Sequence, residues 1–424
     1  MMSFTTKTAY VVITMIVFIA QSLPVPAATG ASSIDNQQNP VPIQYFGLHM
    51  QNAREEWPKV RFGSWRLWDA NVSWRDLEPQ PGQWRFEKLD QYVALAQQNH
   101  VELVLPLGVT PAWAAKRPLE PSAYGPGNAS EPKNFSDWEE YVEAVARRYR
   151  KKIKYYEFWN GVNLKKYYTG NIATLVDLQK RTYAILKEND PGCVLVSASV
   201  STEHADYAGW LDRYLAAGGG EYADIIGIHF YSTNNPPEAI VERMHTVRTV
   251  LRRYGADKKP LWNTEMGWWI ENTDGTPTPT WIDPKAWTKL DANTAAAYVA
   301  RSLVLGRSTG LDRYFWYSWD HAGVGLVEPR ARKIKDAGLA YGKVVNWLEG
   351  AEFLGCRNEQ DLWICSLKKN SRRKWILWTT QSAARDWVIP KELNVVSIET
   401  LLGIAKTTDA RKISVGSQPV LMSE

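Results

Sequence analysis

The chain has 424 residues, of which 45% are hydrophobic and 22% are charged. This balance is typical of a globular protein with one large domain and a smaller one, and it excludes a disordered or fibrous chain. The formal charge of +5 comes from 50 basic and 45 acidic residues that are interspersed along the sequence. Because the charge is diffuse, it argues against a nucleic-acid partner.

Residues 1–28 have the pattern of a signal peptide. Lys7 precedes an apolar run that extends from Ala9 to Ala20, and Val25 and Ala27 suit positions −3 and −1 of a cut after Ala27. The apolar run is too short for a comfortable membrane span, so we expect none after processing and predict a secreted or periplasmic protein. An uncleaved N-terminal anchor is the alternative.

The three cysteines, Cys193, Cys356 and Cys365, are too few for a disulfide-rich scaffold or a cysteine-based zinc site. Cys356 and Cys365 flank a hairpin-like stretch and could bridge in an oxidising compartment. The six histidines are scattered without a paired-ligand spacing, and no glycine-rich phosphate loop follows the first strand. We therefore expect no metal and no nucleotide or redox cofactor.

After a polar linker at residues 29–41, short apolar runs alternate with segments of helical spacing. The eight runs are 44–49, 64–69, 101–108, 154–160, 194–199, 224–230, 260–265 and 314–319. Strand-helix alternation predicts a parallel sheet, and eight repeats predict a closed (β/α)8 barrel, a TIM barrel, at residues 42–348. A doubly wound open sheet is the alternative, but no Gly-x-Gly-x-x-Gly motif follows any run.

Beyond the barrel the pattern changes to short alternating strands. We predict them at residues 352–355, 362–367, 374–379, 386–389, 395–400 and 413–420. They indicate a small antiparallel, β-sandwich-like domain at residues 349–424.

Polar and aromatic residues gather at the predicted strand ends, where a parallel barrel places its chemistry. In chain order they are His49, Arg66, Asp69, Trp113, Asn160, His229, Tyr231, Glu265, Trp268, Trp319 and Asp320. A lone histidine at a strand end is more often a core residue, but so many such residues together are hard to assign to chance. Flat aromatic faces at these places suit pyranose rings, and the chain has 21 tryptophans.

Six segments carry a family resemblance. They are Tyr-Phe-Gly-Leu-His at 45–49, Trp-Arg-Leu-Trp-Asp at 65–69, the stretch 74–84, Glu-Phe-Trp-Asn at 157–160, Gly-Ile-His-Phe-Tyr at 227–231 and Trp-Asn-Thr-Glu at 262–265. Over about residues 42–420 the chain resembles clan A glycoside hydrolases, and within them family 39 and its exopolysaccharide-associated relatives. The resemblance implies a retaining hydrolase of O-glycosidic bonds in a polysaccharide, and with the signal-peptide pattern we expect an exported protein, which we take to be a monomer.

The resemblance also assigns roles to single residues. Glu265 corresponds to the nucleophile, Asn160 to the residue that binds the sugar 2-hydroxyl, and Arg66, His229 and Tyr231 to supports of the nucleophile. We expect the other substrate contacts to come from four further residues at the strand ends, His49, Trp113, Trp268 and Trp319.

One position departs from the family pattern. The fourth strand of the family ends in Trp-Asn-Glu-Pro, whose Glu is the acid/base, whereas Gly161 and Val162 follow Asn160 here. A retaining site needs two carboxyl groups about 5 to 5.5 Å apart, and glycine supplies none. Glu157 is placed too deep in the barrel to substitute, which leaves Glu203, His204, Asp69, Asp320 or a relaying water molecule as conjectural donors.

Two functions from different classes follow. The protein is either a hydrolase with an altered acid step or a catalytically silent glycan-binding protein that keeps the cleft. A deliberate inactivating change at Gly161 is a third reading, disfavoured because Val162 departs from the pattern as well. For Glu265 the structural alternative is a carboxylate that pairs with Arg66 and holds the barrel mouth together.

Overall fold

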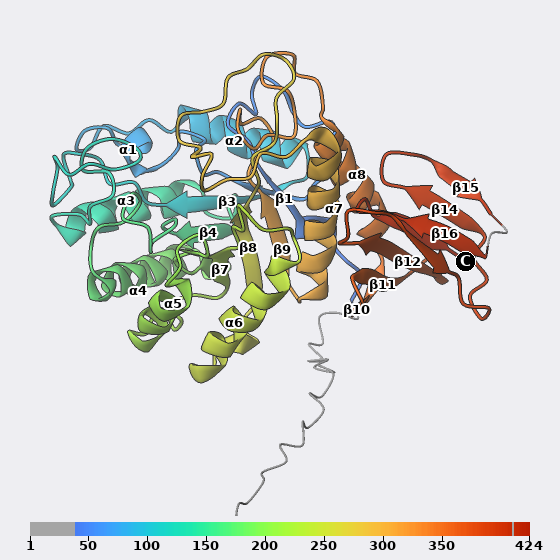
Figure 1. Ribbon diagram of the computed structural model, residues 1–424. Coiled ribbons are helices and arrows are strands. Elements are labelled where there is room, and N and C mark those ends of the chain that lie inside the picture. The colour runs from blue at the N-terminus through green and yellow to red at the C-terminus, as the bar shows by residue number, and fades with distance from the viewer. Residues whose placement is uncertain (1–38, 409–410) are drawn as a thin grey trace, which may run out of the picture. The chain divides into compact units, whose positions relative to one another are not determined.

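The computed structural model describes residues 39–408 and 411–424. The predicted signal peptide at 1–28 and the linker up to residue 38 lie outside the described residues. Within them, a parallel sheet surrounded by helices is followed by antiparallel strands near the C-terminus (Figure 1). The predicted TIM barrel with a C-terminal antiparallel β region is confirmed, although the domain boundary at residues 348 and 349 stays a prediction.

The parallel sheet closes into a barrel. Among the described residues its order is β5-β4-β3-β2-β1-β9-β8-β7-β6, and a parallel bridge between Val196 and Ile225 joins the two ends. The strands are β1 Phe46–His49, β2 Ser64–Arg66, β3 Glu102–Leu107, β4 Tyr155–Phe158, β5 Val194–Val196, β6 Val200–Ser201, β7 Ile226–His229, β8 Leu261–Met266 and β9 Arg313–Trp316. Each strand lies within or overlaps a predicted apolar run, except β6, which begins one residue after the fifth run ends. The eight runs therefore mark the barrel.

The fifth barrel strand is interrupted, which the sequence did not indicate. β5 pairs with β4, and β6 pairs with β7. The short strands β5 and β6 therefore share one position of the barrel, and the nine strands fill eight positions. In the break, the hydroxyl of Ser197 accepts a hydrogen bond from the backbone N–H of Gly227 at 3.0 Å. The hydroxyl of Ser199 donates to Glu157 at 2.5 Å inside the barrel. The break therefore supplies a polar group to the barrel interior.

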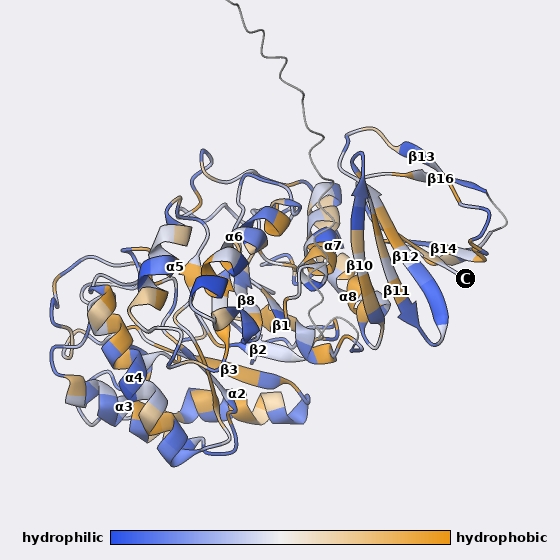
Figure 2. Ribbon diagram, turned by 90° about the horizontal axis from the view of Figure 1, so that it is seen from below, coloured by the Kyte–Doolittle hydropathy of each residue, from blue (hydrophilic) through white to orange (hydrophobic). Residues whose placement is uncertain are grey.

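Helices cover the outside of the barrel and carry both hydrophobic and hydrophilic residues, as covering helices do (Figure 2). They are α2 Glu87–Gln98, α3 Phe135–Arg148, α4 Ile172–Asn189, α5 Tyr207–Ala216, α6 Ala239–Arg253, α7 Ala292–Ser308 and α8 Asp336–Leu348, whereas the four-residue helix α1 Trp74–Leu77 lies in the segment between β2 and α2. The side chains of Asn171 and Asp291 cap α4 and α7 by accepting hydrogen bonds from the backbone three residues on, each at 2.8 Å.

The C-terminal strands form a six-stranded sheet, in the order β10-β11-β12-β17-β14-β15, and a two-stranded sheet of β13 and β16. The strands are β10 Glu352–Glu359, β11 Leu362–Lys369, β12 Arg372–Thr379, β13 Arg385–Val388, β14 Ser397–Thr400, β15 Ala405–Thr407, β16 Lys412–Val415 and β17 Val420–Ser423. The predicted strand at 413–420 is therefore two strands, and β15 was not predicted. A disulfide joins Cys356 and Cys365, which face each other across β10 and β11.

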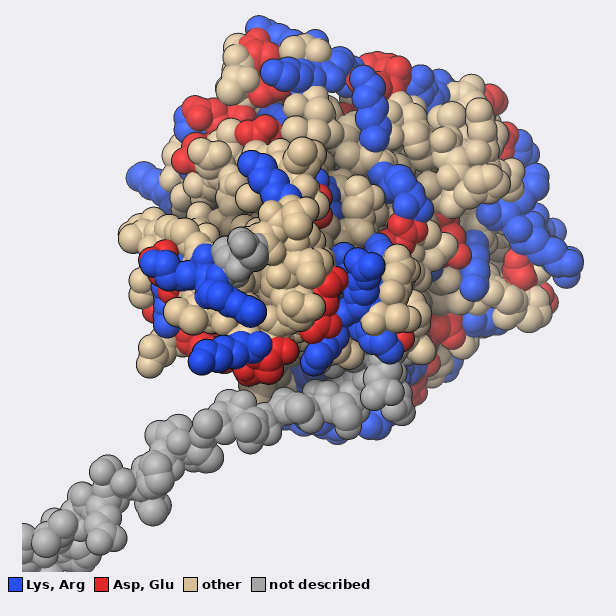
Figure 3. All heavy atoms as spheres, turned by 90° about the vertical axis from the view of Figure 1, so that its right-hand side faces the viewer, with Lys and Arg blue, Asp and Glu red and all other residues tan. Residues whose placement is uncertain are grey.

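One hydrophobic core continues from the barrel helices into the six-stranded sheet, where Phe353, Leu367 and Trp378 belong to it. A second core, with Trp375 and Val415, fills the space between the two C-terminal sheets. On the face that carries these strands, basic and acidic side chains are intermixed wherever the structure describes it (Figure 3). None of the described helices has the length and apolar character that crossing a bilayer requires.

Glu238 links the barrel to the C-terminal sheet. Its carboxylate accepts hydrogen bonds from Nε of Arg301 and from Nε1 of Trp378, each at 2.8 Å. Glu238→Ala leaves the buried Arg301 guanidinium without its carboxylate, so we expect the free energy of unfolding to fall by about 3 kcal/mol. Urea denaturation followed by tryptophan fluorescence measures it. Glu242→Ala, on the exposed side of α6, is the control and should change stability by less than about 0.5 kcal/mol. Equal effects of both variants would contradict the role of Glu238.

Candidate active site

A cavity of about 1120 Å³ opens at the carboxyl ends of the barrel strands. Its walls come from the segments that follow the strands, and every barrel position contributes. Representative lining residues, in chain order, are Gln51, Trp68, Asp69, Tyr124, Tyr167, Glu203, His229, Tyr231, Glu265, Trp281, Trp287, Tyr317 and His321. This is the edge of the sheet at which the sequence places its candidate residues.

Arg66 organises the floor of this cavity. Its guanidinium donates two hydrogen bonds to Glu157, one of them at 2.8 Å, and one to Oε2 of Glu265 at 3.0 Å. A further bond at 2.7 Å reaches the side-chain oxygen of Asn160. Burial acts to lower the pKa of Arg66, but the charges of Glu157 and Glu265 outweigh it and raise that pKa. Strands β2, β4 and β8 are thus tied together by one buried cation.

Glu265 is the carboxylate on the cavity floor, and its side chain is 11% exposed. Oε1 accepts a hydrogen bond from the hydroxyl of Tyr231 at 2.9 Å. Burial raises the pKa of Glu265 to about 7, although Arg66 and the Tyr231 hydroxyl both act to lower it. The group therefore exchanges its proton close to neutral pH.

The two predicted histidines are neutral at this pH. Burial and the nearby charge of Arg66 hold the pKa of both His49 and His229 well below the usual value. His229 lines the cavity, with Nδ1 at 4.0 Å from Glu265, whereas His49 lies beneath it and bonds the backbone oxygen of Thr264 at 3.0 Å. His229 is therefore placed to face a ligand, and His49 supports strand β8.

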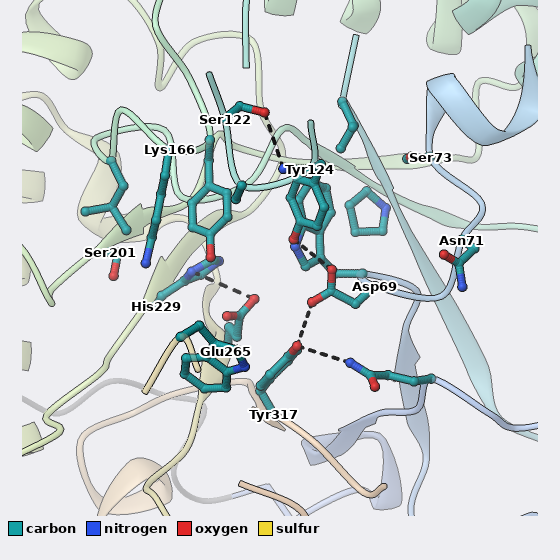
Figure 4. Close-up of a pocket in the computed structure, with 18 of the residues that line it drawn as sticks. Asp69, Asn71, Ser73, Ser122, Tyr124, Lys166, Ser201, His229, Glu265 and Tyr317 are labelled. Carbon is teal, nitrogen blue, oxygen red and sulfur yellow. Dashed lines mark hydrogen bonds and ion pairs between the residues drawn. The ribbon is translucent and has the colours of Figure 1, made fainter. Parts of the chain in front are cut away.

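Asp69 sits opposite Glu265 and is held by two phenol groups (Figure 4). Its carboxylate accepts hydrogen bonds from Tyr124 at 2.7 Å and from Tyr317 at 2.6 Å. The backbone at Asp69 has a φ of 58°, in the left-handed region, which turns the chain immediately after β2. The site thus contains a second carboxylate, but one whose two oxygens both have protein partners.

Aromatic rings form one wall of the cavity. Tyr231, Trp287 and Trp281 are in successive edge contacts, with ring centroids 5.8 and 5.6 Å apart, and Trp281 also lies 5.3 Å from His321. Trp281 is 48% exposed at this wall. A large ring left partly in solvent beside a cavity offers the flat apolar surface that a sugar ring can cover.

Of the eight predicted substrate contacts, only His229 and Tyr231 line the cavity. His49, Arg66 and Asn160 are buried beneath it, and the three predicted tryptophans also lie outside its lining. The indole N–H of Trp113 donates to the backbone oxygen of Glu78 at 3.0 Å, and that of Trp268 donates to Ser232 at 3.0 Å. Trp268 and Trp319 are both buried, at 0% and 3% exposure. These indoles have protein partners or are packed in the core. The tryptophans that line the cavity are instead Trp281 and Trp287.

The ring of Tyr167 occupies the space in which a side chain at position 161 would stand. A Cβ placed on Gly161 would lie 2.7 Å from Cδ2 of Tyr167, well inside contact distance, and the φ of +52° at Gly161 disfavours any other residue. Asn160 beside it is buried and bonded to Arg66. The space that the sequence had suggested for a relaying water molecule is therefore occupied by the Tyr167 ring.

The structure also places the other conjectural donors. Glu157 is fully buried under Arg66, and the carboxylate of Asp320 accepts the backbone N–H groups of Gln51 and Asn52 at 2.9 and 2.7 Å. Glu203 does line the cavity, 3.8 Å from the amine of Lys166, whereas His204 does not. Within the described residues, no group of three or more His, Cys, Asp and Glu side chains could hold a metal ion.

Several cavity residues had no signal in the sequence. Tyr124, Tyr167, Trp281 and Trp287 lie in long segments between strands and helices, where nothing local specifies which way a side chain points. Tyr317 directly follows β9 and could have been found by extending the strand-end argument by one residue.

Comparison with known proteins agrees with this geometry. The family described as glycosyl hydrolase catalytic core matches residues 129–337, and the family described as beta-galactosidase matches residues 63–155. The chain is therefore similar in sequence and in fold to glycoside hydrolases. No curated protein matches the sequence of this glycoside hydrolase-like chain significantly.

Three solved structures show the shared fold of this glycoside hydrolase-like protein. A family 39 glycoside hydrolase from the gut symbiont Bacteroides cellulosilyticus WH2 has a TM-score of 0.67 at 19% identity, over 92% of this chain and 81% of that chain. A monomeric beta-xylosidase from Caulobacter crescentus CB15 has a TM-score of 0.66 at 15% identity, over 91% and 97%. A GH30 endoxylanase from Clostridium papyrosolvens C71 has a TM-score of 0.60 at 12% identity, over 91% and 97%. The fold that the resemblance to family 39 implied is therefore confirmed.

The ionisation of Glu265 should make stability depend on pH. A carboxyl whose pKa is raised on folding, here from 4.5 to about 7, binds its proton more tightly in the folded state. Its contribution to stability is therefore greatest below about pH 4.5 and falls as the pH rises to about 7. Between pH 4.5 and 8 the variant Glu265→Gln should gain up to about 3 kcal/mol relative to the parent. Urea denaturation of both proteins across this range measures the difference, and a difference that stays constant with pH would contradict the raised pKa.

Proposed function

We propose that this protein is an exported glycoside hydrolase that binds a polysaccharide in the cavity and cleaves its O-glycosidic bonds with retention, with Glu265 as the nucleophile. The observation that carries the proposal is the setting of Glu265, a carboxylate on the cavity floor that Arg66 and Tyr231 hold in place. Two donors fix its oxygens, so its position is defined before a sugar arrives.

The cavity suits an extended carbohydrate. Its volume of about 1120 Å³ exceeds the roughly 300 to 1,000 Å³ typical of small-molecule pockets, and Trp281, Trp287 and Tyr317 supply ring faces. The similar structures include a beta-xylosidase and an endoxylanase, and one matching family is described as beta-galactosidase. We infer a β-linked substrate and place xylosides and galactosides first in a panel with glucans, mannans and acidic exopolysaccharides.

Export is part of the proposal. Disulfides persist in oxidising compartments, and two of the three cysteines form one here. The N-terminal sequence of the mature protein tests it, because processing after Ala27 would leave Ala28 as the first residue.

A second function is glycan binding without turnover. The Tyr167 ring beside Gly161, where the family pattern has its acid/base Glu, favours it, because no carboxyl group can stand there. In that case the cleft holds or escorts a polymer, and Glu265, held by Arg66, serves recognition alone.

Substitution of Glu265 separates the two functions. Glu265→Gln removes the attacking oxygen anion while nearly preserving shape. We therefore expect hydrolysis of 2,4-dinitrophenyl β-glycosides, whose leaving groups need no acid, to become undetectable in the variant. Binding of the polymer, measured by calorimetry, should remain. Because Glu265 ionises with a pKa of about 7, the parent activity should rise between pH 5 and pH 8. A variant as active as the parent would remove Glu265 from the mechanism, and binding with no turnover in the parent would establish the second function.

Restoring a carboxyl group at Gly161 tests the acid/base position. Gly161→Glu alone would press its Cβ against the Tyr167 ring and strain the backbone at a φ of +52°, so we expect little gain. The double variant Gly161→Glu with Tyr167→Ala removes the clash, and it should hydrolyse unactivated oligosaccharides roughly 10² to 10⁴ times faster than Tyr167→Ala alone. Tyr167→Ala alone is the matched control. No gain in the double variant, when it folds and binds the oligosaccharide, would show that this position is not where the acid/base acts.

A further inference from the structure

Tyr167 is fixed to the end of the strand that carries Gly161. From β4 the chain makes two turns, in which the backbone N–H of Leu164 donates to Gly161 at 2.9 Å and that of Tyr167 donates to Leu164 at 2.8 Å. The indole N–H of Trp159 then donates to the backbone oxygen of Tyr167 at 2.9 Å. The tyrosine is thereby held to the two residues that flank Asn160.

The Tyr167 side chain faces the cavity. Its ring lies 5.9 Å from that of Tyr124, at 31° between the planes, and the amine of Lys166 stands 5.1 Å from its centre. Of the four tyrosines in the cavity lining, three have hydroxyls bonded to carboxylates, since Tyr124 and Tyr317 bond Asp69 and Tyr231 bonds Glu265. The hydroxyl of Tyr167 makes no hydrogen bond to any residue that the structure describes, and the ring lines the cavity, so a ligand can reach this donor.

The surroundings keep this hydroxyl protonated. Burial, and after it the negative charges of Glu265, Asp69 and Glu203, raise the pKa of Tyr167 well above the usual value for a phenol. A protonated phenol can donate to an oxygen that gains negative charge. The amine of Lys166 beside the ring would stabilise the phenolate that remains.

We propose that Tyr167 is the catalytic acid and base of this site and stands in for the carboxyl group that Gly161 cannot provide. The inference rests on the proposed function and names the group that completes it. In the first step an oxygen of Glu265 forms a bond to the anomeric carbon, and the glycosidic C–O bond breaks with its electron pair on the leaving oxygen. That oxygen takes the proton of Tyr167. In the second step a water molecule gives its proton to the Tyr167 phenolate and its oxygen to the anomeric carbon, which releases Glu265.

A phenol is a weaker acid than a carboxyl group, and this sets the expected rate. General acid-base catalysis contributes roughly 10² to 10⁴, and its efficiency depends on a pKa near the working pH. A donor with a pKa above 10 recovers only part of this factor, so we expect slow turnover of unactivated glycosides.

The test compares two leaving groups in Tyr167→Phe, which keeps the ring and removes the donor. On methyl β-glycosides of the panel sugars, kcat should fall by roughly 10² or more, because an alkoxide cannot leave without a proton. On the 2,4-dinitrophenyl β-glycosides, kcat of the first step should change by less than about threefold, since this leaving group needs no acid. The parent activity should not decline before about pH 10, the ordinary pKa of a phenol.

Tyr168→Phe is the matched control. Its hydroxyl donates to the backbone oxygen of Asn171 at 3.2 Å and does not line the cavity, so both substrates should be hydrolysed as by the parent. Equal losses on both substrates in Tyr167→Phe would show a structural role, and no loss on either would show no role; each overturns this inference and leaves Glu265 in place. A parent that binds polymer but cleaves neither substrate overturns the inference together with the proposed function.

Discussion

The guanidinium of Arg66 holds the mouth of this barrel together. It is fully buried and shared between Glu157, deep in β4, and Glu265, at the cavity floor on β8. Burying an ion costs several kcal/mol, and only well-placed opposite charges and hydrogen bonds offset that cost. The network therefore extends further: Glu157 also accepts from Ser199, and Ser199 bonds the hydroxyl of Thr264 at 2.9 Å. The interruption of the fifth strand, which places Ser199 inside the barrel, belongs to the same polar framework.

Sharing one cation between two carboxylates has an electrostatic consequence. Arg66 directs two donors at Glu157 and one at Glu265, so its charge offsets the burial of Glu265 only in part, and the pKa of Glu265 rises to about 7. The two histidines nearby cannot compensate, because burial and the same cation keep them neutral. The arrangement that fixes the carboxylate in space also limits how much of it is ionised at neutral pH, and a nucleophile of this kind works best on the alkaline side.

The sequence predicts site residues at strand ends well and site residues in the long connecting segments poorly. Apolar runs located all eight barrel positions, and the residues at their ends included Glu265, Arg66, His229 and Tyr231, because the end of a parallel strand has a known place in the barrel. Trp281, Tyr124 and Tyr167 could not be located, since their positions depend on how long segments fold back over the sheet. Trp113 and Trp268 were chosen for their aromatic character, yet their indole N–H groups bond backbone oxygens beneath the surface. Residue type alone did not reveal whether an aromatic ring would face the cavity or pack behind its lining.

Gly161 and Tyr167 form one structural unit. The φ of +52° at Gly161 starts the two turns that bring Tyr167 back, and the ring that returns occupies the space a side chain at position 161 would need. A larger residue at 161 would meet both the strain of the left-handed backbone and the ring, so a carboxyl group there and the tyrosine in its present place exclude each other. The strand end that lacks a carboxyl group is therefore followed, in the same segment, by a turn that brings the side chain of Tyr167 to the cavity. Because the replacement comes from six residues further along the chain, a comparison of residue 161 alone with the family pattern shows what is lost and not what has taken its place.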